Sequence, residues 1–213
     1  MLSNKTIVNS WNEWDALKRI IIGHADDCMV QAPELAAQRH WSENGYPKGK
    51  LGPYPKDMID MANQQLDNFS KMLESRGIIV DRPTPLDFSQ QVSTPDWVQG
   101  SMVGCMPPRD LLLPVGNEIV EAPMSFRSRW IEYLSYRPIL EKYFTEDPNF
   151  RYEAAPKPRL TEQTYKEGFL INWKTLSDDE KKRHMRESYW ILTEVEPCFD
   201  AVDVVRCSKD LFV

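Results

Sequence analysis

The fold class is decided by one stretch, DMIDMANQQLDNFSKMLESRGIIV, which runs from Asp57 to Val80. Apolar side chains recur in it at steps of three and four residues, the spacing that places them on one face of an α-helix. Asp57 can cap the start of this helix and Gly77 can close its end. The apolar run 78–80 predicts a strand directly after the helix, and the prolines that follow would end that strand. The recurring apolar residues are Ile59, Ala62, Leu66, Phe69 and Leu73.

Another strand is predicted before this helix. The run Leu17–Gly23 is short, rich in β-branched residues and stopped by glycine, which is typical of a buried strand. Strand, helix and strand in this order indicate an α/β fold. Trp11 and Trp14 are expected to form a small satellite core over the first strand. The proline- and glycine-rich segment 31–56 predicts a long loop that acts as a lid or cover. Its aromatic residues favour an ordered loop: Trp41, Tyr46 and Tyr54.

Further along the chain, two apolar segments predict a β-hairpin. They are Leu111–Val115 and Glu118–Met124, and a Gly-Asn pair joins them. Pro114 cannot donate a hydrogen bond to a neighbouring strand, so its strand should lie at a sheet edge or bulge there. Residues 130–144 have helical spacing, and Pro138 should kink that helix or mark its true start. The apolar face of this helix is expected to consist of Ile131, Leu134, Leu140 and Phe144.

The last segment of the chain also predicts strands. Residues 189–193 and 202–206 have strand-like alternation, and residues 207–210 predict a turn. A further strand would begin at Leu211, two residues before the end of the sequence. Since strands typically run about 5 to 6 residues, we expect the sequence to stop within a strand and to be cut short.

Acidic residues stand at the points where loops become apolar strands. Asp110 precedes one predicted strand, and Asp200 and Asp203 stand at the start of another. An ionised Asp in such a segment is unfavourable unless it is paired or hydrogen-bonded, so each is either a turn residue or part of a polar site. Carboxylates that converge from two hairpins would suit a planar guanidinium, whose N–H groups match two carboxylate oxygens. The residues alone leave both interpretations open.

The composition excludes several classes of function. The 213 residues carry a formal net charge of -6, whereas a nucleic-acid-binding surface needs clustered Lys and Arg. The basic run 181–183 follows the acidic run 178–180 and predicts a solvated helix face. No apolar run reaches the roughly 18 residues of a membrane span, and the N-terminus lacks an apolar signal region. We therefore expect a cytoplasmic protein with no nucleic-acid or membrane partner.

The cysteines and histidines form no recognisable ligand pattern. The four cysteines are widely scattered without a C-x-x-C pair, and the three histidines keep no ligand spacing with them. We therefore expect reduced thiols, no disulfide framework, no metal and no cofactor. Nothing in the composition divides residues 1–213 into more than one domain. These residues are Cys28, Cys105, Cys198 and Cys207, with His24, His40 and His184.

Six longer strings carry a family resemblance. They are Trp11–Leu17, Pro107–Asp110, Val115–Met124, Arg127–Arg129, Ala155–Pro158 and Thr193–Asp203. These strings resemble the glycine (arginine) amidinotransferase family in their residues and in their order along the chain. The resemblance extends from near residue 10 to the end of the sequence. The resemblance implies the pentein fold, an α/β propeller of ββαβ modules around a central polar channel. It implies that residues 1–213 form an incomplete, N-terminal part of one such domain.

The resemblance also implies a reaction. The amidino group of L-arginine would move to a cysteine thiolate, releasing ornithine, and then to an amine acceptor such as glycine or a biosynthetic amine. Matched position by position, Asp200 is the acid that partners the catalytic His. Asp110 binds the substrate guanidinium, and Asp203 lines the substrate site. The expected partners are these small molecules. Whether the protein forms a homodimer is left undecided by the sequence.

One departure from the family pattern affects the chemistry. The family places its catalytic His and its nucleophilic Cys downstream of the Phe-Asp-Ala-x-Asp motif, beyond the sequence in hand. Cys198 and Cys207 lie near Asp200, but a nearby carboxylate raises the pKa of a thiol and disfavours either as the nucleophile. We therefore expect no turnover by these residues alone. Two alternatives stay open: a guanidine hydrolase (deiminase) of the same fold, and an inactive truncated protein that only binds a partner.

Overall fold

The computed structural model describes residues 6–36, 51–166, 175–186 and 191–213. Its first half contains the strands and helix β1 (Arg19–Ile21), β2 (Met29–Val30), β3 (Gly52–Pro53), α1 (Lys56–Glu74), β4 (Ile79–Asp81), β5 (Val92–Ser93) and β6 (Val98–Gln99). The remaining helices and strands are α2 (Pro108–Leu111), β7 (Leu112–Val115), β8 (Glu118–Glu121), α3 (Tyr133–Glu146), β9 (Arg151–Ala154), α5 (Asp178–Arg186), β10 (Val205–Cys207) and β11 (Asp210–Phe212). Short 3-10 turns are η2 (Arg127–Arg129), η3 (Glu162–Thr164) and η4 (Ala201–Asp203).

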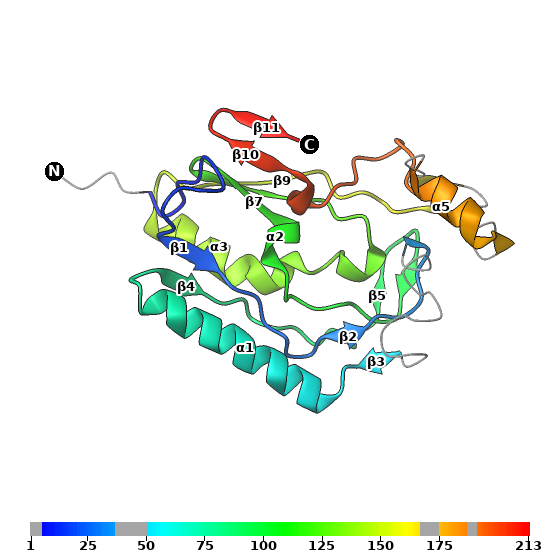
Figure 1. The fold of residues 1–213 in the computed structure, drawn as a ribbon, viewed down its shortest axis with the longest axis horizontal. Coiled ribbons are helices and arrows are strands. Elements are labelled where there is room, and N and C mark those ends of the chain that lie inside the picture. The colour runs from blue at the N-terminus through cyan, green and yellow to red at the C-terminus, as the bar shows by residue number, and fades with distance from the viewer. Residues whose placement is uncertain (1–5, 37–50, 167–174, 187–190) are drawn as a thin grey trace.

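Two strand–helix–strand units form the framework (Figure 1). In the first, β1 lies parallel to β4, and α1 connects them and packs on β4. In the second, the β7–β8 hairpin is followed by α3, and β9 then returns parallel to β8. This second unit has the ββαβ order that the family resemblance implies. The strands form small sheets of two or three members, so the fold is α/β with open sheets.

Helix α1 agrees with the prediction over residues 57–77 except at its start. Pro55 occupies the N-cap position without a side-chain hydrogen bond, so the prediction that Asp57 caps the helix is wrong. Asp57 lies in the first turn, where its charge still interacts favourably with the helix dipole. At the other end, Gly77 has a φ of 78°, and the Ile78 N–H donates to the Leu73 carbonyl at 3.2 Å. Gly77 therefore closes the helix as predicted.

Helix α3 departs from the prediction in two ways. It begins at Tyr133 and continues through Pro138, so this proline does not mark its start. Its buried face contains Tyr136, Ile139, Leu140 and Tyr143, whereas two predicted core residues, Leu134 and Phe144, are exposed. The tyrosines can occupy the core because their hydroxyls find acceptors there: the Cys105 carbonyl accepts from Tyr136 at 2.7 Å.

The two predicted hairpins, around Gly116 and at residues 207–210, are confirmed. β7 and β8 pair antiparallel across Gly116, and β7 lies at the edge of its sheet, where Pro114 is tolerated. β10 and β11 pair antiparallel through the predicted turn. The strand expected over 202–206 is shorter, because Ala201–Asp203 forms a 3-10 turn first. Residues 187–190 lie outside the described residues, and Leu192 makes only an isolated bridge to Tyr165.

The N-terminal tryptophans do not form the predicted satellite core. Trp11 is 47% exposed and Trp14 is 66% exposed. This segment instead fastens the C-terminal hairpin, since Glu13 accepts two hydrogen bonds from the Arg206 guanidinium, at 2.8 and 2.6 Å. In the predicted loop 31–56, Trp41 and Tyr46 lie outside the described residues, while Gly52–Pro53 forms β3 and Tyr54 is partly buried.

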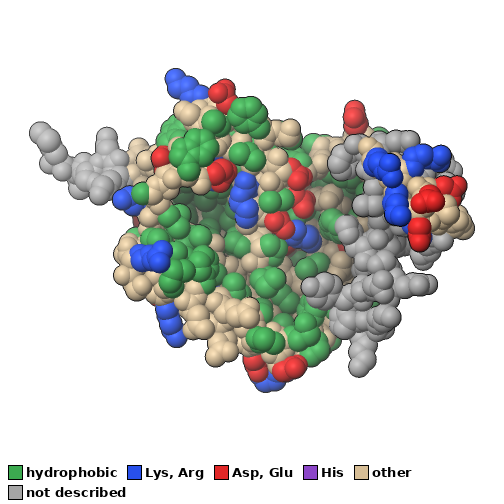
Figure 2. All heavy atoms as spheres, viewed as in Figure 1, with side chains coloured by type: hydrophobic (Ala, Val, Ile, Leu, Met, Phe, Trp, Pro, Cys, Tyr) green, Lys and Arg blue, Asp and Glu red, His purple; other side chains and the backbone are tan. Residues whose placement is uncertain are grey.

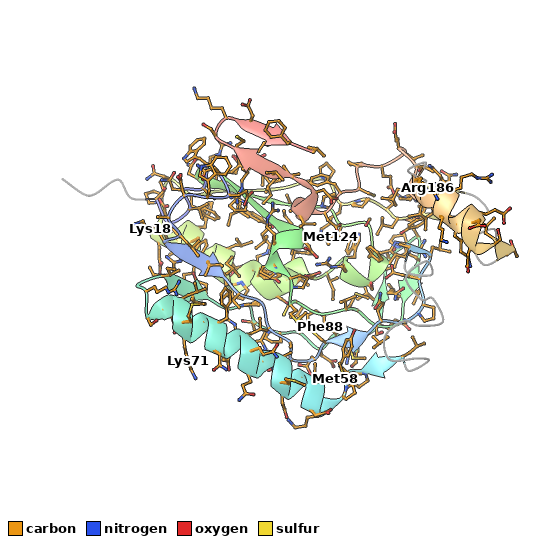
Figure 3. The ribbon with its side chains drawn as sticks, in the orientation of Figure 1. Lys18, Met58, Lys71, Phe88, Met124 and Arg186 are labelled. Carbon is orange, nitrogen blue, oxygen red and sulfur yellow. The ribbon has the colours of Figure 1, made fainter. Side chains whose placement is uncertain are left out.

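The main core lies between the second unit and the segment that precedes it in the chain, which contributes Phe88, Met102 and Cys105. Phe88, Leu111, Met124 and Tyr136 are completely buried in one apolar cluster. Figure 3 shows the labelled Phe88 and Met124 toward the middle of the molecule, well away from α5. On α5, Lys181 and Lys182 pair with Asp178 and Asp179, as expected for a solvated face. No helix among the described residues is both long and apolar enough to cross a membrane.

Candidate functional site

A buried arginine, Arg129, lies at the centre of an acidic cluster that comes from separate parts of the chain. Its Nη1 atom donates to Asp110 Oδ2 at 2.8 Å and lies 3.9 Å from Asp200 Oδ2. Its Nε and Nη2 atoms donate to the two carboxylate oxygens of Glu132, at 2.6 and 3.0 Å. The structure thus brings Asp110 and Asp200 to the same guanidinium. We call Asp110, Arg129, Glu132 and Asp200 the acidic cluster.

The surface above this cluster carries both charges. Figure 1 shows α2 and η4 near the middle of the view, below the β10–β11 hairpin. In the same orientation, Figure 2 shows acidic and basic side chains gathered in this central region, among apolar ones. The side chains of Asp110 and Asp200 remain 25% and 22% exposed, whereas that of Glu132 is 1% exposed. Asp110 and Asp200 therefore face the surface, and Glu132 lies behind Arg129.

Asp200 has unused hydrogen-bonding capacity. Its Oδ1 atom is buried, and no donor among the described residues bonds to it. Burial raises the pKa of this carboxyl above its ordinary value, Asp110 and Asp203 add to that rise, and the positive charge of Arg129 and the backbone N–H of Ser125 oppose it. A buried acceptor without a donor is unfavourable, so this oxygen is suited to an incoming N–H group. An imidazole or a guanidinium would supply one.

Arg109 connects the two segments that carry Asp110 and Asp200. Its guanidinium donates to the carbonyl oxygen of Ala201, and its Nη2 donates to that of Val204 at 2.6 Å. These bonds connect α2, which carries Asp110, to η4, which directly follows Asp200. The residues that the Pro-Arg-Asp motif places side by side thus act in different ways: Arg109 binds the backbone of the opposite wall, and Asp110 binds Arg129.

The η2 turn that carries Arg129 is held by hydrogen bonds to Glu34. The Glu34 carboxylate accepts hydrogen bonds from the backbone N–H groups of Arg127, at 2.6 Å, and Ser128, at 3.3 Å. Burial raises the pKa of Glu34, and the hydrogen bonds from Ser128 and Arg127 act against that rise. The Arg127 side chain is fixed in turn by the Leu160 carbonyl, at 2.9 and 2.6 Å. Arg129 is therefore presented by a well-anchored backbone.

Asp203 is placed differently from the other two predicted acids. Its side chain is exposed, and it makes no recorded side-chain bond to the acidic cluster. Its backbone N–H donates to the Asp200 carbonyl at 3.0 Å and closes the η4 turn. The negative charge of the Asp203 side chain also raises the pKa of Asp200.

All four cysteines are free thiols, and the environments of Cys28, Cys105 and Cys198 disfavour the thiolate. Burial raises the pKa of Cys28 and of Cys198 to about 11, and that of Cys105 to about 12. For Cys198, the negative charges of Glu196 and Asp200 add to the effect of burial. This agrees with the expectation that a thiol beside Asp200 is a poor nucleophile. No group of His, Cys, Asp and Glu in the described parts of the chain could hold a metal ion.

Sequence reasoning missed the centre of the cluster. Arg127–Arg129 was recognised as a characteristic string but received no role, and Glu132 was not considered at all. The one available signal was their spacing: Arg129 and Glu132 are three residues apart, a distance at which side chains on a helical turn can pair. Nothing in the sequence indicated that the partners of this pair would be Asp110 and Asp200.

Comparisons with known proteins point in one direction. No family model matches the sequence. Glycine amidinotransferase, mitochondrial, of Gallus gallus is 36% identical over 211 residues, which are 97% of this chain and 48% of that protein. L-arginine:L-lysine amidinotransferase of Pseudomonas savastanoi pv. phaseolicola is 35% identical over 96% of this chain and 54% of its own length. The chain therefore spans about half the length of the curated relatives it matches.

A solved structure supports the same relationship. SxtG, an amidinotransferase from Microseira wollei in the saxitoxin biosynthetic pathway, superimposes with a TM-score of 0.78 at 37% sequence identity. The match covers 96% of this chain and 53% of the SxtG chain. At this identity the two chains are similar in sequence as well as in fold.

Proposed function

We propose that this chain, a homologue of amidinotransferases over nearly its whole length, provides the carboxylate wall of an active site that transfers the amidino group of L-arginine to an amine acceptor. The observation that carries this proposal is the acidic cluster. Asp110 and Asp200 come from different parts of the chain, share the Arg129 guanidinium and keep partly exposed carboxylates. Carboxylates arranged around one guanidinium have the chemistry needed to bind a second.

The proposed roles follow from the chemistry of the transfer. Asp110 would hold the substrate guanidinium by charge-assisted hydrogen bonds while a thiolate attacks its central carbon. Asp200, through its unpartnered Oδ1, would accept an N–H from a histidine that protonates the departing ornithine amine. The thiolate would then be regenerated when an amine acceptor takes the amidino group. Asp203 would line the substrate site from its exposed position next to Asp200.

The reaction needs a nucleophilic thiolate, and the thiols of Cys28, Cys105 and Cys198 are poorly suited to provide it. The pKa values of Cys28, Cys105 and Cys198 are all raised, so these thiols stay protonated at neutral pH. We therefore propose that residues 1–213 form the N-terminal part of one propeller domain, and that the reactive Cys and His belong to another part of it. The free thiols suit a reducing compartment, for which we propose the cytoplasm. The name of the Gallus gallus relative places that protein in the mitochondrion.

The binding role can be tested by replacing Asp110. We expect Asp110→Asn to weaken L-arginine binding by about tenfold or more, because the amide keeps the shape of the side chain but removes the charge that faces the guanidinium. Isothermal titration calorimetry with L-arginine measures the change, and L-ornithine, which lacks the guanidinium, serves as the ligand control. Asp67→Asn is the matched protein control, since Asp67 also pairs with an arginine, Arg82, but lies outside the cluster. Equal arginine affinity in wild type and Asp110→Asn would remove Asp110 from the site.

The catalytic part of the proposal has a separate test. We expect the 213-residue polypeptide, incubated with L-arginine and either glycine or L-lysine, to release no ornithine above the protein-free background. The physical reason is that a protonated, buried thiol is a weak nucleophile. Chromatographic detection of ornithine and citrulline checks the result. Ornithine release would show that a thiol within these residues is reactive, and citrulline would instead indicate the hydrolase.

A further inference from the structure

Glu132 is the one carboxylate of the acidic cluster to which the proposed reaction assigns no role. Its side chain is 1% exposed, and both of its oxygens accept hydrogen bonds from Arg129, at 2.6 and 3.0 Å. These bonds use the Nε and Nη2 edge of the guanidinium, whereas Nη1 faces Asp110 and Asp200. Arg129 therefore lies between Glu132 and the two surface-facing carboxylates. Any change of charge on one side of Arg129 is felt on the other.

The charges around Glu132 are unbalanced. Arg129 is the cation that pairs with Glu132, and the negative charges of Asp110 and Asp200 act on Glu132 from across the guanidinium. Tyr136 of α3 and the thiols of Cys28 and Cys105 are neutral groups that lie near enough for the charge of Glu132 to raise their pKa values. Burial raises the pKa of Glu132 to about 7, although Arg129 acts to lower it. Three carboxylates share one guanidinium, and Glu132 is the most deeply buried of them, so it is the carboxyl whose ionisation is least favoured.

We propose that Glu132 is a positioning residue of the guanidinium site, which holds Arg129 in place and releases a proton when a guanidinium ligand binds to Asp110 and Asp200. The proton passes from the Glu132 carboxyl to solvent, and the ligand cation replaces it in the charge balance of the cluster. This inference rests on the proposed function, because it requires the ligand to be a guanidinium that binds at these carboxylates.

The direction of the coupling follows from electrostatics. Without ligand, Asp110 and Asp200 oppose ionisation of Glu132 and compete with it for the positive charge of Arg129. A bound guanidinium neutralises these two carboxylates, so the pKa of Glu132 falls and its proton leaves. By linkage, the ligand binds more tightly to the form with ionised Glu132. Affinity should therefore rise as pH increases through about 7 and fall, by up to about tenfold per pH unit, below it.

The experiment counts protons. Isothermal titration calorimetry with L-arginine at pH 7 is run in phosphate and in Tris, two buffers whose enthalpies of protonation differ strongly. We expect the wild-type chain to release a fraction of a proton per arginine bound, and Glu132→Gln to release none and to bind with an affinity that does not vary from pH 6 to 8. Glu121→Gln is the matched control, since Glu121 is 1% exposed and paired with a cation, Lys157, outside the cluster. This control should keep the wild-type proton release.

A second measurement needs no variant. In wild-type protein labelled with ¹³C at the glutamate carboxyl carbons, the Glu132 resonance should titrate near pH 7 and at a lower pH when L-arginine is present. A merely structural pairing with Arg129 would not move this midpoint. Arginine binding with no proton release and an unchanged midpoint would overturn the role of Glu132 but leave the guanidinium site standing. The absence of any arginine binding would overturn both.

Discussion

Replacing Arg129 by methionine is expected to lower the free energy of unfolding by about 3–5 kcal/mol at pH 8, the typical effect of leaving a buried charge without its partner. Arg129 is the shared counter-ion of three carboxylates, and its loss leaves the fully buried Glu132 without that cation, so at pH 8 this carboxyl must either stay protonated or be ionised and unpaired, and both cost free energy. Asp110 and Asp200 would suffer less, because both remain partly exposed to water. Urea unfolding monitored by tryptophan fluorescence measures the loss.

The pH dependence of this variant identifies the cause. Burial already raises the pKa of Glu132 to about 7 in the presence of Arg129, and removal of the guanidinium raises it further. A raised carboxyl pKa lowers the stability of the folded state as pH rises from the unfolded-state pKa, about 4.3, toward the raised folded-state value, so Arg129→Met should be less stable at pH 8 than at pH 5.5. Adding Glu132→Gln should restore part of the stability at pH 8. A loss that is the same at both pH values, and that Glu132→Gln does not relieve, would show that packing rather than charge is responsible.

Replacing Gly23 by alanine is expected to destabilise the fold by an amount on the order of 3 kcal/mol, at the upper end of the usual effects of overpacking. A Cβ at this position would lie 1.8 Å from the backbone oxygen of Met106, far inside van der Waals contact. Gly23 is not among the glycines with positive φ, so alanine could adopt its backbone conformation and the clash alone decides the outcome. Because the clash is with backbone, a side-chain rotation cannot relieve it.

The matched control is Gly100→Ala. This glycine also lacks a positive φ, but the added Cβ would meet only the Cβ of Ala32, at 3.2 Å. A shift of a few tenths of an ångström would accommodate it, so its effect on the unfolding midpoint should be small. Thermal melts followed by circular dichroism compare the two. Similar midpoints for both variants would mean that the segment after β1 and the segment around Met106 are not packed as closely as the structure shows.

Elements that depend on nearby residues were predicted well from the sequence. The α1 helix followed from the spacing of Ile59 to Leu73 and from Gly77, whose left-handed backbone ends it. The hairpin around Gly116 followed from its turn residues and from alternation in the flanking strands. In both cases the information lies within a few residues, because helical periodicity and turn conformation are local properties of the chain.

The errors lie where distant segments decide the environment. The predicted apolar face of residues 130–144 included Leu140, which is buried, but also Leu134 and Phe144, which are exposed. The tyrosines of α3 occupy the core in their place, since acceptors from other segments satisfy their hydroxyls. Trp11 and Trp14 were expected to form a small core over the first strand, yet both are exposed, and the segment that carries them instead pairs Glu13 with the buried Arg206. Hydrophobic side chains alone could not reveal these competing partners.

For the site, the sequence by itself determined which residue types are present and, through family strings, singled out Asp110 and Asp200. Only the tertiary structure decided what they do together. Asp110 and Arg129 are 19 residues apart, and Arg109 reaches a carbonyl 92 residues away, so no local spacing could have joined them. The strength of a charge pair and the pKa of a carboxyl depend on distance and burial, which exist only once the chain is folded. For that reason Glu132, unremarkable in the sequence, becomes a central residue of the folded protein.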